Sequence, residues 1–309
     1  MSHFTVLVTG PNVEEQLQPY HEFECTGEDD QYVSDIDETE ESLKDFEEHG
    51  EGRTFLEFIE YWTGATLLTS PPLPSHKFNY ILQNEDGSYK VIRRTNPNSK
   101  WDWYQIGGRW SGFFKLKPEG SGALGDRSLL MRNEPPVKSG RADVAYKGDI
   151  DFAGMEEDAR LKATERYDFF ESLISSLPEN ERSFIPWKEC WKHLNTENID
   201  EVRAFYNSQP VIELIAKLKI GDNELSDHLQ WNTDDYAVSR DEFIERGVDS
   251  SWSVFALLHR GEWISRGDMG WWGCVSNEVD DEEGYRKYVR TLIHALPDDA
   301  LLTLVDCHI

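Results

Sequence analysis

The two ends of the chain carry the patterns that most constrain its fold. The segment HFTVLVTG, residues 3–10, is rich in β-branched residues, and ALLTLVDCHI, residues 300–309, holds an apolar run of strand length. Both patterns are typical of β-strands. Because such strands must be buried in a sheet, the sequence predicts that the first and last strands lie near each other at its centre.

The segments between the ends predict helices and hairpins. Asp86-Gly87 and Arg260-Gly261 each divide two strand-like runs, as hairpin turns do. Apolar residues at helical spacing indicate helices at about 55–64, 155–177, 183–193, 199–218 and 281–296. Together these elements predict an α+β protein with a mixed or antiparallel sheet and helices on one face, of the ferredoxin-like or split βαβ kind.

The order of these elements suggests how the chain is divided. Residues 1–114 form the N-terminal part of the α+β core and include an acidic segment, 22–60. Residues 115–150 are rich in Gly, Pro and charge, which predicts an irregular stretch. Residues 151–220 are expected to form a helical insertion, and residues 221–309 the C-terminal part of the core.

Composition limits the class of protein. With 309 residues, 38% of them hydrophobic, the chain can bury a sizeable core, and no stretch approaches the roughly 20 apolar residues that span a bilayer. The N-terminus lacks the basic start and cleavage site of a signal peptide, so we expect a soluble protein in the cytoplasm. The four cysteines are scattered, which predicts reduced thiols and no zinc site. No cofactor is expected.

Charge is the largest signal in the composition. Its 59 acidic residues against 31 Lys and Arg give a formal net charge of −28. Such a field repels nucleic acid and anionic membranes and attracts basic surfaces, so neither direct DNA binding nor membrane binding is expected. The charge is segregated, because residues 22–60 hold 16 acids against two bases, whereas residues 87–141 hold 11 bases against four acids.

The acidic segment has two interpretations. It can be a solvated surface or a loop, or it can be a docking surface for a basic partner. On the second interpretation, the partner-binding residues are predicted to be Glu28, Asp29, Asp30, Asp35, Asp37 and Glu38.

The block WDWYQIGGRWSGFF, residues 101–114, gathers six aromatic residues, a Gly-Gly pair and one arginine. It can be a bulged strand in an aromatic core, with Arg109 paired to a carboxylate. It can also be a nucleotide site in which aromatic rings stack on a base and Arg109 binds a phosphate. The candidate ligand-binding residues are Trp101, Trp103, Tyr104 and Arg109, with Trp101 and Trp103 expected on one side of a strand.

Two further segments hold candidate functional residues. In GDMGWWGC, residues 267–274, Trp271 and Trp272 are either part of the core or an exposed interface anchor. At the C-terminus, Cys307 and His308 are neighbours on a predicted strand, so their side chains point to opposite faces and form no dyad. His308 can instead pair across the sheet with His3 or His21.

Four segments resemble a known group of proteins. They are MSHFTVLVTGPNVEEQLQPYHEFECTG, NPNSKWDWYQIGGRWSGFF, KGDIDFAGM and LPDDALLTLVDCHI, and they are similar to an uncharacterised protein family of bacteriophages, prophages and plasmids. The resemblance covers both ends and the aromatic block and is weaker over about 157–221. It implies an accessory phage protein, and strongly acidic proteins of this kind are often inhibitors of host machinery. No family residue role is implied.

The sequence therefore supports three functions. No GxSxG, HExxH, EF-hand or phosphate-loop motif is present, which lowers the expectation of an enzyme without excluding one. The leading hypothesis is a counter-defence protein that binds the basic surface of a host nucleic-acid-handling complex, for example a nuclease–helicase defence system such as Gabija. The alternatives are a nucleotide-binding protein or enzyme that uses the aromatic block, and a virion structural protein. A homo-oligomer remains an open alternative.

Overall fold

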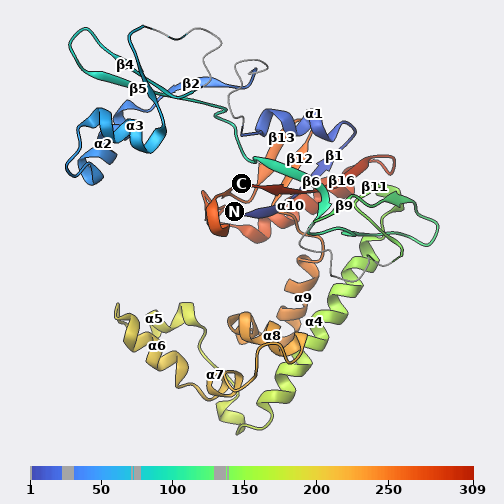
Figure 1. Ribbon diagram of the computed structural model, residues 1–309. Helices are drawn as coiled ribbons and strands as arrows, with labels where there is room; N and C mark the ends of the chain where they lie inside the picture. Colours follow the sequence, from blue (N-terminus) through green and yellow to red (C-terminus); the bar gives the residue numbers. More distant parts are fainter. Residues whose placement is uncertain (1, 23–30, 71, 73–77, 129–136, 138) are drawn as a thin grey trace.

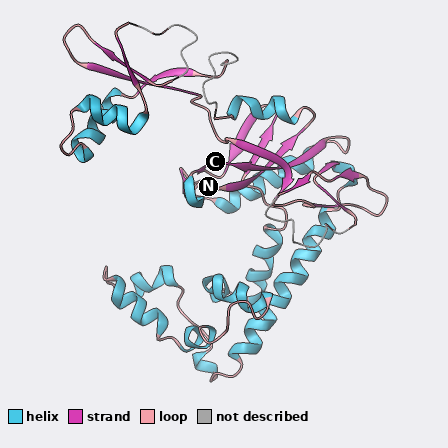
Figure 2. Ribbon diagram, viewed as in Figure 1, coloured by secondary structure: helices cyan, strands magenta, loops and turns pink. Residues whose placement is uncertain are grey.

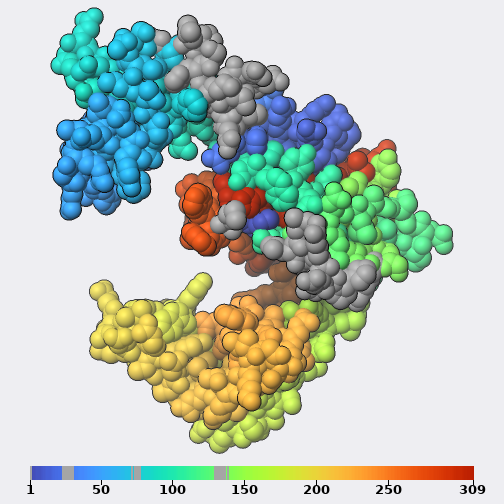
Figure 3. Space-filling view, viewed as in Figure 1, coloured from blue at the N-terminus to red at the C-terminus, as the bar shows by residue number. Residues whose placement is uncertain are grey.

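The computed structural model describes residues 2–22, 31–70, 72, 78–128, 137 and 139–309. It has the predicted α+β class, and Figure 1 shows three parts: a central sheet domain, an N-terminal module and a helical lobe. The N-terminal module (residues 31–95) and the helical lobe (residues 152–249) project from the central domain toward the same side, with open space between them in the space-filling view (Figure 3).

The central sheet is built around the two ends of the chain. Strand β1 (His3–Thr9) pairs antiparallel with β16 (Leu301–His308) over its whole length, which confirms the predicted central pair. On its other side β1 pairs in parallel with β12 (Ala256–His259), and β12 forms the predicted hairpin with β13 (Glu262–Ser265).

Strand β16 has two partners on its other edge. Residues of β6 (Trp103–Gly108) pair with one half of β16, and residues of β11 (Val144–Tyr146) pair with the other half. Two short strands extend these edges, β8 (Gly122–Ala123) beside β11 and β9 (Asp126–Arg127) beside β6. Two separate two-stranded sheets lie in the loops: β7 (Phe114–Lys115) with β10 (Arg141–Ala142), and β14 (Asp268–Met269) with β15 (Val275–Ser276).

Helices cover both faces of the central sheet. Leu7, on one face, packs in the same cluster as Tyr285 and Ile293 of α10 (Glu282–Ala295). On the other face, Val6 and Val8 pack with Leu17 of α1 (Val13–Leu17). We expected helices on one face only. Because the consecutive residues 6–9 of β1 are all buried, both faces of the strand need a cover.

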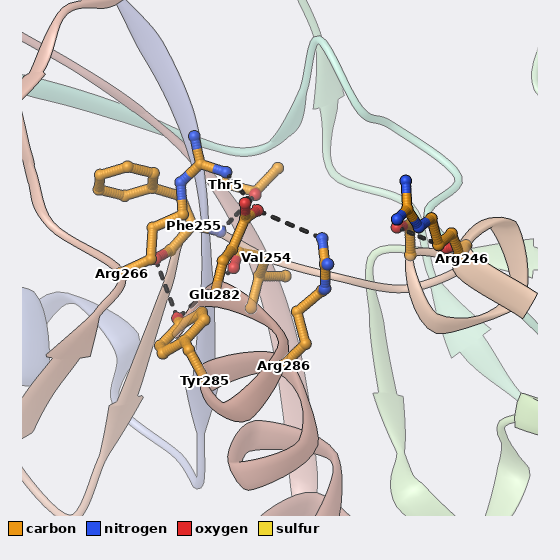
Figure 4. A network of polar contacts seen from close by, with 9 residues as sticks. Thr5, Arg246, Val254, Phe255, Arg266, Glu282, Tyr285 and Arg286 are labelled. Atoms are coloured by element: carbon orange, nitrogen blue, oxygen red, sulfur yellow. Dashed lines mark hydrogen bonds and ion pairs between the residues drawn. The ribbon is translucent and has the colours of Figure 1, made fainter. Parts of the chain in front are cut away.

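Helix α10 is held to the sheet by polar contacts as well as by its apolar side (Figure 4). The Tyr285 hydroxyl donates a hydrogen bond of 2.9 Å to the carbonyl oxygen of Phe255. The Glu282 carboxylate lies between two guanidinium groups, 2.9 Å from Arg266 and 3.2 Å from Arg286. Asp281 caps the helix by accepting a hydrogen bond from the Gly284 amide.

The N-terminal module has its own sheet. Its strand order is β2 (Ser34–Asp37), β5 (Tyr89–Thr95), β4 (Tyr80–Gln83) and β3 (Thr66–Leu68). The β4–β5 hairpin turns at Asp86-Gly87, as predicted. Two helices pack on the sheet through Phe58, Ile59, Ile81 and Val91: α2 (Thr39–His49) and α3 (Phe55–Thr63).

The helical lobe extends further along the chain than expected. We predicted that helices end near residue 220, yet helices continue to Asp249 and strands resume at Ala256. Gly247 of the last lobe helix faces Ala163, which lets that helix lie close along the first (Figure 2). The lobe helices are α4 (Phe152–Ile174), α5 (Trp187–Leu194), α6 (Ile199–Asn207), α7 (Pro210–Ile215), α8 (Glu224–Trp231) and α9 (Arg240–Asp249). Within the described ranges, no helix is both long enough and apolar enough to span a bilayer.

Candidate functional site

The aromatic block is shaped by a fully buried carboxylate, Asp143. Its two oxygens accept hydrogen bonds from the backbone amides of Gly112 (2.5 Å) and Gly125 (2.9 Å) and from the hydroxyl of Ser111 (3.0 Å). A buried carboxylate needs several such donors, because it has lost its hydration. Asp143 therefore fixes the loop that follows β6.

A second buried carboxylate, Asp306, explains the Gly-Gly pair. Asp306 accepts a hydrogen bond of 2.9 Å from the Arg109 amide. Gly107 and Gly108 have positive φ angles of 75° and 53°. A Cβ atom at Gly107 would overlap the Asp143 carboxylate, and one at Gly108 would overlap that of Asp306. Both positions thus require glycine for its backbone conformation and for its small size.

The end of the central sheet carries two histidine–carboxylate pairs. The Nδ1 atom of His3 lies 2.7 Å from the buried carboxylate of Asp306. The Nδ1 atom of His308 lies 2.5 Å from the carboxylate of Asp102. The two imidazole rings meet edge to face with centroids 4.9 Å apart, as their opposed positions in β1 and β16 require. This confirms the predicted pairing of His308 with His3.

This arrangement limits the chemistry of the two histidines. A carboxylate on Nδ1 orients each ring and leaves Nε2 as the atom that can meet a ligand. Cys307 points to the opposite face, where burial raises the pKa of its thiol well above the usual range. It forms no nucleophilic pair with His308. Among the described residues, no three His, Cys, Asp or Glu side chains are grouped to hold a metal ion.

The four predicted ligand residues do not form one surface. Trp101 is buried, and its indole N–H donates to the carbonyl oxygen of Leu17 at 3.1 Å. Tyr104 packs edge to face on Trp101, and burial raises the pKa of its phenol. Trp103 lies on the other face, next to His3, and is 49% exposed. The side chain of Arg109 is also exposed.

The expectation that Trp101 and Trp103 share one side of a strand is therefore wrong. Trp101 precedes β6 and forms an isolated bridge with His21, so the alternation of the strand does not reach it. Of the predicted set, only Trp103 and Arg109 have exposed side chains, and the Trp103 ring lies next to that of His3.

The second tryptophan pair lies at the surface. Trp271 is 72% exposed and Trp272 is 83% exposed. Their loop is tied to the N-terminus, because the Ser2 hydroxyl donates to the Gly270 carbonyl oxygen (2.6 Å) and accepts from the Gly273 amide (2.7 Å). The position of the two indoles fits the predicted interface anchor, whose role stays a prediction.

Three of the predicted acidic docking residues have partners within the N-terminal module. Asp35 accepts a hydrogen bond from the Tyr80 hydroxyl at 3.0 Å. Asp37 accepts one from the Thr39 hydroxyl at 2.6 Å, and this bond lowers the pKa of Asp37. Glu38 lies 3.3 Å from the Arg93 guanidinium. The other three, Glu28, Asp29 and Asp30, lie outside the described residues.

The N-terminal module also holds a groove that the sequence did not reveal. Its volume is about 750 Å³, and it lies between α2 and α3. Glu41 and Asp45, four residues apart on α2, line it together with Trp62 of α3, which is 65% exposed. The i, i+4 spacing of the two acids was visible in the sequence. The placement of α3 against α2, which brings Trp62 to them, was not.

Comparison with protein-family models, with curated proteins and with solved structures finds no match to this chain.

Proposed function

We propose that this chain is a phage-encoded acidic accessory protein that binds and inhibits a host complex in the cytoplasm. The target is a nucleic-acid-handling or anti-phage defence complex with a basic surface, for example a nuclease–helicase system such as Gabija. The observation that carries the proposal is the acidic N-terminal module, which stands apart from the central sheet and is free to meet a partner (Figure 1).

Charge supports this function. Residues 31–95 hold 13 acidic residues against six Lys and Arg, and the whole chain carries −28. A protein that binds DNA presents a basic surface to the phosphates, and an acidic protein is attracted to the same surface. Occupying that surface blocks the nucleic acid and needs no catalytic residue.

Exposed aromatic residues supply the second part of the proposal. Electrostatic attraction speeds the encounter but contributes less to lasting affinity than buried aromatic anchors do. Trp62, Trp271 and Trp272 are all largely exposed and are available for this role.

The proposal is tested by DNA cleavage with a purified Gabija nuclease–helicase complex. We expect the full chain to suppress cleavage in proportion to its concentration. An unrelated acidic protein of similar net charge is the control, and it should leave cleavage unchanged. Unchanged cleavage in the presence of excess chain would reject this target. Equal suppression by the control would show an effect of charge alone.

A second function, the binding of a phosphate-bearing ligand, is favoured by the end of the central sheet. There the exposed Trp103 ring lies beside two oriented imidazoles, and the Arg109 backbone is bonded to the same Asp306 as His3. An aromatic face and cationic donors are the groups that bind a nucleotide. A thermal-shift panel of nucleotides tests it, because a ligand at a hundred times its Kd stabilises by about 2.7 kcal/mol. No shift with any nucleotide would reject it.

A further inference from the structure

We propose that the groove between α2 and α3 receives an arginine side chain from a short segment of the partner protein. This inference rests on the proposed function and names the contact through which the acidic module recognises a basic surface. The groove is lined by Glu38, Glu41, Ser42, Asp45, His49, Phe58, Ile59, Trp62, Thr63 and Arg93.

The floor of the groove is apolar and well packed. Phe58 and Ile59 of α3 are buried, with 4% and 1% of their surface exposed, and they belong to the core of the module. Phe46 of α2 packs edge to face on Phe58, with ring centroids 5.6 Å apart, which holds the two helices together. A long side chain with an aliphatic stem can lie on such a floor while its charged end stays near the rim.

The rim carries acidic groups that the module itself does not neutralise. Glu38 is paired with Arg93, the arginine of the groove. Glu41 and Asp45 are exposed, and neither forms an ion pair within the described part of the chain. Their spacing of four residues puts both carboxylates on one side of α2. The groove therefore has two carboxylates available for an incoming cation.

Trp62 provides the second kind of contact with a cation. Its ring is 65% exposed although it lies next to the Phe58 ring in the same groove. Tryptophan is the best aromatic partner for a cation, and a guanidinium group also stacks on its face. Arginine is favoured over lysine, because its planar group can stack on the indole and hydrogen-bond to carboxylates at the same time.

The volume of the groove suits a segment rather than an isolated side chain. Its 750 Å³ exceeds the space that one arginine fills, so neighbouring residues of the partner enter with it. A second hollow, lined by Asn79, Val91 and Ile92, shares Trp62, Thr63 and Arg93 with the first and continues it along β5. Nucleic acid does not fit as the occupant, because its phosphates would face Glu41 and Asp45.

The experiment measures binding of an acetylated arginine–glycine repeat peptide to the full chain by calorimetry at low salt. The same peptide with citrulline in place of arginine keeps the shape and removes the charge. We expect the arginine peptide to bind and the citrulline peptide not to bind. The E41Q/D45N variant should weaken binding about tenfold, which corresponds to about 1.4 kcal/mol. W62A should weaken it by a similar factor.

Matched controls separate the groove from general charge. E40Q/E47Q removes two charges from the same helix at positions that do not line the groove, and W231A removes an exposed tryptophan from the helical lobe. Both should leave the affinity within about twofold. Equal losses in E41Q/D45N and E40Q/E47Q, or no binding of the arginine peptide, would overturn the inference.

The proposed function and the groove contact are rejected by different results. If the arginine peptide binds the groove but the full chain does not suppress cleavage by the nuclease–helicase complex, the groove stands and this target is rejected. If cleavage is suppressed equally by the wild-type chain and by E41Q/D45N, the target stands and the groove is rejected as the contact.

Discussion

At the scale of single residues, the loop after β6 is fixed by two buried carboxylates that the pattern of apolar residues does not reveal. Asp143 and Asp306 are fully buried in the central domain and hold the loop after β6 through backbone amides. The Gly107-Gly108 pair lies directly against them. The sequence predicted a bulge at these glycines, but not that two carboxylates, distant in the chain, lie against them.

The Gly108→Ala variant tests this interpretation. The added methyl group would overlap the Asp306 carboxylate at a backbone φ of 53°, so we expect a loss of about 2–4 kcal/mol in the free energy of unfolding. Gly87 is the matched control, because it has a φ of 85° and no atom within 4 Å of an added Cβ. Gly87→Ala should cost only about 1 kcal/mol. Urea unfolding of both variants makes the comparison, and equal losses would refute the packing argument.

Cysteine reactivity tests the burial of β16. Cys307 is buried and its pKa is raised by that burial, whereas Cys274 is exposed. In the native protein at pH 8, iodoacetamide should alkylate Cys274 and leave Cys307 intact, because the thiolate is the reactive form. Peptide mapping by mass spectrometry measures both sites, and in urea both should react. Rapid native alkylation of Cys307 would show that the strand is not buried as described.

At the scale of elements, local sequence patterns predicted those helices and hairpins whose own residues form a clear pattern. The two hairpins were predicted from their turn residues, and the helices α3 and α10 from apolar residues at helical spacing. The helices α8 and α9 were missed, because their short apolar faces are completed only by packing on α4. For the same reason, the α2–α3 groove could not be predicted.

The helical lobe should be sensitive to acid through His228. Its Nδ1 atom lies 2.9 Å from the Tyr236 hydroxyl, and burial, followed by Arg166 and Lys162, lowers the pKa of His228 to about 4. In the unfolded chain His228 takes up a proton near pH 6.5, whereas in the folded lobe it does so only near pH 4. The neutral imidazole therefore makes its full contribution to the free energy of unfolding above pH 6.5. That contribution is lost as the pH falls toward 4.

The His228→Gln variant measures this contribution. Between pH 7 and pH 5, the wild-type chain should lose about 1–2 kcal/mol more stability than the variant, since one pKa unit corresponds to about 1.4 kcal/mol. Urea midpoints of the two proteins across this range give the difference. Parallel pH profiles for the two proteins would contradict the assignment.

At the scale of the whole molecule, charge and shape lead to the same proposal. The acidic module and the helical lobe project from the central domain toward the same side, with open space between them (Figure 3). Exposed tryptophans lie on all three parts: Trp62 on the module, Trp271 and Trp272 on the central domain, and Trp231 on the lobe. Net charge could be read from the composition alone, and it indicated a basic partner. The separation of the acidic module from the core required the structure, because its sheet pairs strands far apart in the chain, such as Ser34 with Thr95.

The most direct test of the central claim is the affinity of the full chain for a purified nuclease–helicase complex at two salt concentrations. We expect binding at 50 mM NaCl that weakens about tenfold or more at 300 mM, because exposed charges are screened over a shorter distance at higher salt. The E41Q/D45N variant should bind more weakly at both concentrations. No binding at low salt, or an affinity that does not depend on salt, would contradict the claim.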